Sequence, residues 1–164
     1  MYDATSIERY YYAVALAIDN SDKSNLKLSL QIATSGDSEG SSSSQSTSAQ
    51  IYSVDCETID VGINIINNYL SKKINLSHCS ALIFSEEIAK KGIGGYINTL
   101  ANNPQIRPTA TILISNTDAS EVLENVSNSG EKYSSRYYEF VLNSTDYTGY
   151  APNSELGRFF YNIN

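Results

Sequence analysis

The sequence predicts an α+β domain in which packed helices cover a mixed β-sheet. Two observations predict this class. Segments typical of strands dominate the first 56 residues, in an order that favours early antiparallel hairpins. From Thr58 onward helical and strand-like segments alternate, which is typical of β-α-β units. The 164 residues suit one domain, and no apolar run approaches the roughly 18 residues of a membrane-spanning helix.

Two strands and a polar turn open the predicted domain. Tyr10 to Ile18 reads YYYAVALAI and is nearly continuous in apolarity, which indicates a strand buried on both faces. Leu26 to Ile32 alternates between leucine or isoleucine and polar residues, which predicts a strand with one face in water. The polar cluster between them favours an antiparallel hairpin.

A serine-rich segment follows the hairpin. Residues 35–50 read SGDSEGSSSSQSTSAQ and contain no residue that forms a core. We expect a flexible surface loop that contributes little to stability, because it cannot bury enough apolar area to offset its ordering entropy. Strand-like sequence resumes in Ala49 to Cys56, which we expect to pair with the second strand.

The first helix is predicted over Thr58 to Lys73, with Thr58 as N-cap and Lys72-Lys73 in the last turn. Further along, the periodicity predicts a helical region over Glu86 to Asn102 that breaks near Gly92. A third helix is predicted over Asp118 to Val126, capped by Thr117 or Asp118. Strands are predicted between these helices, over Cys79 to Phe84 and Thr109 to Ile114.

The signals weaken after residue 128. Tyr133 to Leu142 is consistent with a helix, Thr148 to Pro152 with a turn, and Glu155 to Tyr161 with a last helix.

Composition and motifs argue against several classes of function. The net charge is -7, so the chain repels phosphate backbones and we expect no nucleic-acid partner. The chain has one histidine, and it contains no G-x-S-x-G elbow, P-loop or Cys-x-x-Cys pair. We therefore predict no catalytic, cofactor or metal site. Glu86 and Glu87 are adjacent on a helix and point about 100° apart, so their expected role is to open that helix.

The sequence leaves two questions open at the level of single side chains. His78, at a helix-to-strand junction, is either satisfied by a backbone carbonyl or makes a pH-sensitive contact, and the first is favoured. Cys56 and Cys79 either form a disulfide or are buried free thiols, and the second is favoured.

Four blocks, taken in order, resemble the C subunit of bacterial spore germinant receptors, the Ger(x)C family of spore germination lipoproteins. The first comprises Tyr2-Asp3, Ile7-Glu8-Arg9 and Ala13 to Asp19, and the second is Leu26 to Ile32, followed by a variable loop. The third comprises His78, Glu86-Glu87-Ile88-Ala89 and Gly92-Ile93. The fourth comprises Ile106-Arg107 and Ala119 to Leu123. Tyr2 stands where the family has tryptophan, and Met1 where it has the lipid-bearing cysteine.

This resemblance implies a domain organisation and a location. Residues 1–164 would be the N-terminal domain of a larger lipoprotein from a sporulating Gram-positive bacterium. Residues 2–9 would be a tether, and residues 151–164 the start of the next region. The native protein would be lipid-anchored on the outer face of the spore inner membrane, with the integral-membrane subunits of the receptor as partners. The 164-residue chain itself, without the lipid, is expected to be soluble and not to bind anionic vesicles.

The function that the sequence favours is therefore a non-enzymatic domain that acts in spore germination through protein-protein contacts. The alternative is a lipoprotein domain that binds a small germinant in a pocket lined by tyrosines. We single out His78, Glu86, Glu87, Gly92 and Arg107 as structural or interaction residues, from the blocks that carry the resemblance.

Overall fold

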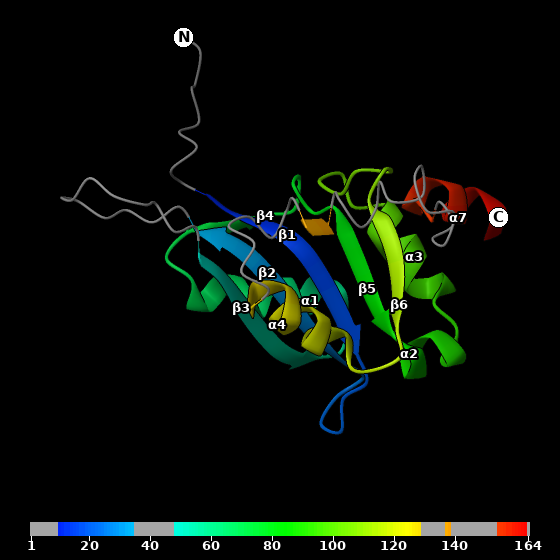
Figure 1. Ribbon diagram of the computed structural model, residues 1–164, viewed down its shortest axis with the longest axis horizontal. Coiled ribbons are helices and arrows are strands. Elements are labelled where there is room, and N and C mark those ends of the chain that lie inside the picture. Colours follow the sequence, from blue (N-terminus) through cyan, green and yellow to red (C-terminus); the bar gives the residue numbers. More distant parts are fainter. Residues whose placement is uncertain (1–9, 35–47, 129–136, 139–153, 164) are drawn as a thin grey trace, which may run out of the picture.

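The computed structural model describes residues 10–34, 48–128, 137–138 and 154–163 (Figure 1). Its named elements are the strands β1 (Tyr10–Asp19), β2 (Leu26–Thr34), β3 (Ser48–Cys56), β4 (Lys73–Asn75), β5 (Ala81–Ser85) and β6 (Thr111–Ser115), and the helices α1 (Ile59–Tyr69), α2 (Glu86–Lys91), α3 (Gly94–Ala101), α4 (Ala119–Asn128) and α7 (Leu156–Ile163). The tether, most of the serine-rich segment, and the segments predicted around residues 133–142 and 148–152 lie outside the described residues, apart from Tyr137 and Tyr138.

The strands form one mixed sheet in the order β3-β2-β1-β5-β6, with β4 pairing on β1. β1 pairs antiparallel with β2, and β2 antiparallel with β3. β5 runs parallel to both β1 and β6. The expected α+β class is therefore confirmed, with early hairpins followed by parallel crossovers through helices.

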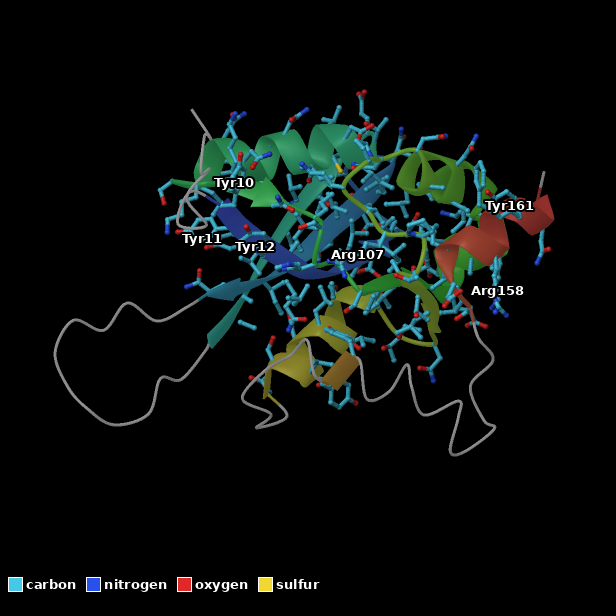
Figure 2. All side chains as sticks on the ribbon, turned by 90° about the horizontal axis from the view of Figure 1, so that it is seen from above. Tyr10, Tyr11, Tyr12, Arg107, Arg158 and Tyr161 are labelled. Atoms are coloured by element: carbon cyan, nitrogen blue, oxygen red, sulfur yellow. The ribbon has the colours of Figure 1, made fainter. Side chains whose placement is uncertain are left out.

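Helices cover both faces of this sheet (Figure 2). One buried cluster joins α1, α2 and α3 to residues such as Leu16, Leu82 and Phe84. The other joins α4 to Val14, Ala15, Ala17, Ala81 and Ile83. β1 contributes side chains to both clusters, which confirms that its apolar run is a strand buried on both faces.

The prediction of a solvent-facing side for the second strand is wrong. Ser29 and Gln31 of β2 are fully buried, because α4 returns over this face of the sheet. Gln31 Nε2 donates to Ser127 Oγ of α4 at 2.8 Å, and Gln31 Oε1 accepts from the hydroxyl of Tyr138 at 2.7 Å. Burial raises the pKa of the Tyr138 hydroxyl. A polar residue in an alternating pattern can thus lie inside when its hydrogen bonds are satisfied.

The first helix is shorter than predicted. Thr58 is its N-cap, as expected, and its side chain accepts from the amide of Val61. However, α1 ends at Tyr69, so Lys72 and Lys73 lie beyond it and do not complement its dipole. Lys73–Asn75 instead forms β4, beside Tyr10–Tyr12 of β1. The side chain of Asn67 accepts from the amide of Ile74 at 2.8 Å, which connects the helix to this strand.

The remaining elements agree with the prediction to within a few residues. Gly92 separates α2 from α3, as expected. The last three residues of the serine-rich segment, 48–50, already belong to β3. α7 packs against α3, and Leu156 and Gly157 donate backbone hydrogen bonds to Ala110 and Pro108. Among the described helices, none has the length and apolarity needed to cross a bilayer.

Candidate functional site

Three parallel strands end at one edge of the sheet, and each ends in a buried polar residue. β1 ends at Asp19, β5 at Ser85 and β6 at Ser115. Since carboxyl ends of neighbouring parallel strands meet at one edge, these residues lie close to the starts of α2 and α4, which follow β5 and β6. We call this region the carboxyl edge.

Asp19 binds the N-terminus of α4, although about 100 residues separate the two in the chain. Its carboxylate oxygens accept from the amide of Ala119 at 2.5 Å and from that of Ser120 at 2.9 Å. Asp19 therefore satisfies two amides that have no partner within the helix and places a negative charge at its positive end. The sequence had favoured Thr117 or Asp118 as this cap. The distant Asp19 makes these bonds because β1 lies directly under the start of α4.

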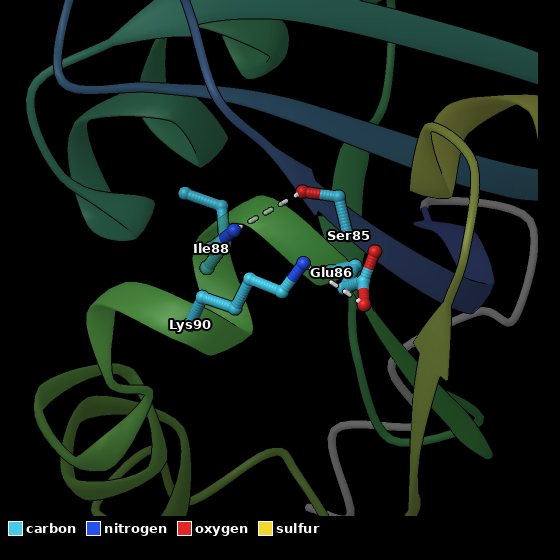
Figure 3. A network of polar contacts seen from close by, with 4 residues as sticks. All are labelled: Ser85, Glu86, Ile88 and Lys90. Carbon is cyan, nitrogen blue, oxygen red and sulfur yellow. Dashed lines mark hydrogen bonds and ion pairs between the residues drawn. The ribbon is translucent and has the colours of Figure 1, made fainter.

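The start of α2 occupies the same edge (Figure 3). Ser85 is its N-cap, and the Ser85 hydroxyl accepts from the amide of Ile88 at 3.5 Å. Glu86 forms an ion pair with Lys90 one turn later, with 3.0 Å between Oε1 and Nζ. Both side chains are largely exposed, so the pair contributes little to stability. At the end of the helix, Lys91 Nζ donates to Asn20 Oδ1 at 2.5 Å and connects α2 to the turn after β1.

Gly92 ends α2 with a positive φ. Its φ is 98°, a region that residues with a Cβ rarely adopt. Its amide donates to the carbonyl of Ala89 at 3.1 Å. The positive φ at the end of this helix therefore explains why Gly92, in the third block of the resemblance, is a glycine.

A second cluster lies at the opposite, amino-terminal end of β1. We call Tyr10, Tyr11, Tyr12, Lys72 and His78 the tyrosine surface (Figure 2 labels the tyrosines). The ring of Tyr12 stacks on that of His78, with centroids 4.5 Å apart. The ammonium of Lys72 lies 5.4 Å from the centroid of the Tyr11 ring, and the Tyr11 hydroxyl is 3.3 Å from Ser71 Oγ. All three tyrosines are partly exposed, and so is Lys72, so the rings and its ammonium group are accessible at the surface.

The five residues singled out from the sequence do not form one site. Glu86, Glu87 and Gly92 lie at the carboxyl edge. His78 precedes β5, and Arg107 precedes β6, so both lie towards the amino ends of these parallel strands. Sequence reasoning missed the role of Asp19, although a charged residue directly after six buried apolar residues, 13–18, distinguishes it in the sequence. It also missed the contact of His78 with Tyr12, which depends on the pairing of β4 with β1.

Both cysteines are buried. Cys56 and Cys79 are buried free thiols, which confirms the favoured alternative. Burial raises the pKa of Cys79 to about 12 and also raises that of Cys56, so neither is a ready thiolate nucleophile. Among the described residues, no group of three or more His, Cys, Asp or Glu could hold a metal ion.

Comparisons with known proteins place these features in a family context. The family model for the spore germination protein N-terminal domain matches residues 3–164. The putative spore germination protein YfkR of Bacillus subtilis (strain 168) is 31% identical over 127 residues, which is 74% of this chain and 33% of that protein. The chain thus spans about a third of the length of this curated relative. No solved structure matches.

Proposed function

The chain belongs to the family of spore germination proteins that share this N-terminal domain, and from this premise we propose that it acts in germination as a non-enzymatic contact domain. Its partners in this proposal are the integral-membrane subunits of a germinant receptor. The whole protein would be held at the outer face of the spore inner membrane by a lipidated cysteine. A domain that only transmits or stabilises contacts needs a recognition surface and no reacting groups.

The observation that supports this proposal best is the tyrosine surface. Tyrosine is enriched in protein interfaces because one ring offers a large apolar area together with a polar tip. Here Tyr11 lies beside Lys72 on one face of β1, and Tyr12, which points to the other face, stacks on the exposed His78. The rings are held by β1 and β4, so little conformational entropy is lost when a partner covers them.

The carboxyl edge has a structural part in the same proposal. Its buried polar groups bind the starts of α2 and α4, Glu86 pairs with Lys90, and Lys91 donates to Asn20. These residues therefore fix the helices on the sheet, while the tyrosine surface remains available for recognition.

The test is a pair of substitutions in the full-length protein, assayed in spores. Lys72→Glu together with His78→Ala removes the cation beside Tyr11 and the ring stacked on Tyr12. We expect the germination response to slow about tenfold, as for a loss of about 1.4 kcal/mol at an interface. The melting temperature of the isolated domain should change little, because both substituted side chains are at least partly exposed.

Tyr161→Ala is the matched control, since Tyr161 is an exposed tyrosine at the other end of the fold. It should leave germination unchanged. Normal germination in the double variant would contradict the proposal. Saturable binding of a small germinant by the isolated domain would instead favour the alternative function, a ligand-binding lipoprotein domain.

A further inference from the structure

β3 is a long edge strand, and within the described residues it lacks the usual protection against pairing. It is nine residues long and pairs with β2 at every position without a bulge. Within the part of the chain that the structure describes, no strand pairs with its outer side. Figure 1 shows β3 at the outer edge of the sheet, with α1 and α4 on either side of it. Natural edge strands usually carry lysine, proline or a bulge that prevents association, and residues 48–54 carry none of these.

The neighbouring flank of α1 is apolar. Val61, Ile65 and Tyr69 recur every four residues and therefore share one side of the helix. Val61 is 42% exposed and Tyr69 is 81% exposed, whereas Ile65 is partly buried against the core. Asn67 lies about 200° around the helix from Ile65. Its side chain accepts a hydrogen bond from the amide of Ile74 in β4. The apolar flank thus faces away from β4, on the β3 side of the domain.

Charges are few in this region of an acidic protein. The first acidic residue along the edge is Asp55, near the end of β3, where its carboxylate accepts from the hydroxyl of Ser21 at 2.7 Å. Neither residues 48–54 nor the three apolar residues of α1 bear a charge. Two copies that each carry a net charge of -7 can therefore approach through this edge without bringing like charges into contact.

From the open edge and the uncharged flank together, we infer that the β3 edge and the α1 flank form the interface of a homodimer. Two identical strands that pair antiparallel are related by a two-fold axis, so one surface satisfies both partners. The pairing extends the sheet across both copies and gives partners to the backbone groups of β3 that pair with no other strand among the described residues. It also brings the two α1 flanks together over the new strand pair.

The size of the interface predicts a weak dimer. The nine residues of β3 and three residues of α1 are about half the number of residues per side in a standard stable interface. We therefore expect reversible association in the micromolar to submillimolar range, which requires no contact through the tyrosine surface. The inference is independent of the proposed function.

The test is sedimentation equilibrium of the chain over a concentration series that reaches about 1 mM. We expect a monomer-dimer equilibrium. Gln50→Lys places a charge on the exposed side of the edge, and Tyr69→Ser removes the most exposed apolar side chain of the flank. Each should weaken dimerisation at least tenfold, while the melting temperature shows that the domain remains folded.

Two controls match these changes in chemistry and exposure. Asn125→Lys adds the same charge at an exposed position of α4, and Tyr161→Ser removes a tyrosine that is 82% exposed on α7. Both should leave the dissociation constant unchanged. A chain that stays monomeric throughout the series overturns the inference. A dimer that Tyr161→Ser disrupts and the β3 and α1 variants do not would place the interface elsewhere and overturn it as well.

Discussion

Asp19→Ala is expected to lower the free energy of unfolding by about 2–3 kcal/mol, through the loss of one side chain that caps a helix from a distant strand. The substitution removes both acceptors for the amides of Ala119 and Ser120, and both residues are buried. For a domain of this size, thermal unfolding should show a decrease in melting temperature of roughly 5–10 °C.

Asp118→Ala tests whether α4 is capped by Asp19, as in the structure, or by its own neighbour Asp118, which the sequence favoured together with Thr117. Asp118 is exposed and was one of the two residues predicted to cap the same helix. Its loss should cost only about 0.5 kcal/mol, through weaker interaction with the helix dipole. If Asp118→Ala destabilises the protein more than Asp19→Ala does, the observed capping arrangement is wrong.

Gly62→Ala is expected to lower the free energy of unfolding by about 1–2 kcal/mol, even though alanine favours helices. A Cβ at this position would lie 2.7 Å from both Cys56 Sγ and Leu28 Cδ2, and 3.2 Å from Leu28 Cβ. Both neighbours are buried, so neither has space to move away. The overpacking costs about 1–3 kcal/mol, which exceeds the gain in helix propensity of up to about 1 kcal/mol.

Gly95→Ala is the matched control on α3. A Cβ there meets no atom within 4 Å, so only the gain in helix propensity remains. Chemical denaturation should therefore show Gly95→Ala as more stable than the original chain and Gly62→Ala as less stable. Equal effects at the two glycines would mean that α1 does not pack this closely on β2 and β3.

The sequence predicted most of the sheet because its strands have strong local signals. The apolar run of β1 and the alternation of β2 each specify a strand without help from the rest of the chain. The β4 strand was missed because three residues give no period to detect, and its pairing with β1 depends on tertiary structure. The burial of Gln31 was missed for a related reason, since it depends on the return of α4 over the sheet.

The candidate site was harder to predict than the fold. Local patterns found the residues at the start and end of α2, because capping and helix-breaking are properties of neighbouring residues. The bonds of Asp19 to α4 and the stacking of His78 on Tyr12 join residues that are far apart in the chain. Periodicity contains no information on such pairs. The family blocks contained Asp19, His78 and Ala119, but a single sequence does not say which of them touch.

Site-specific cross-linking in spores tests the proposed contact function most directly. A photoreactive residue would replace His78 in the full-length protein, with the same residue at position 161 as control, because both positions are exposed and lie on different surfaces. The account predicts cross-links from position 78 to integral-membrane proteins of the germination apparatus, and none from position 161. The account is contradicted if position 78 gives no cross-link to a membrane protein, or if both positions give the same products.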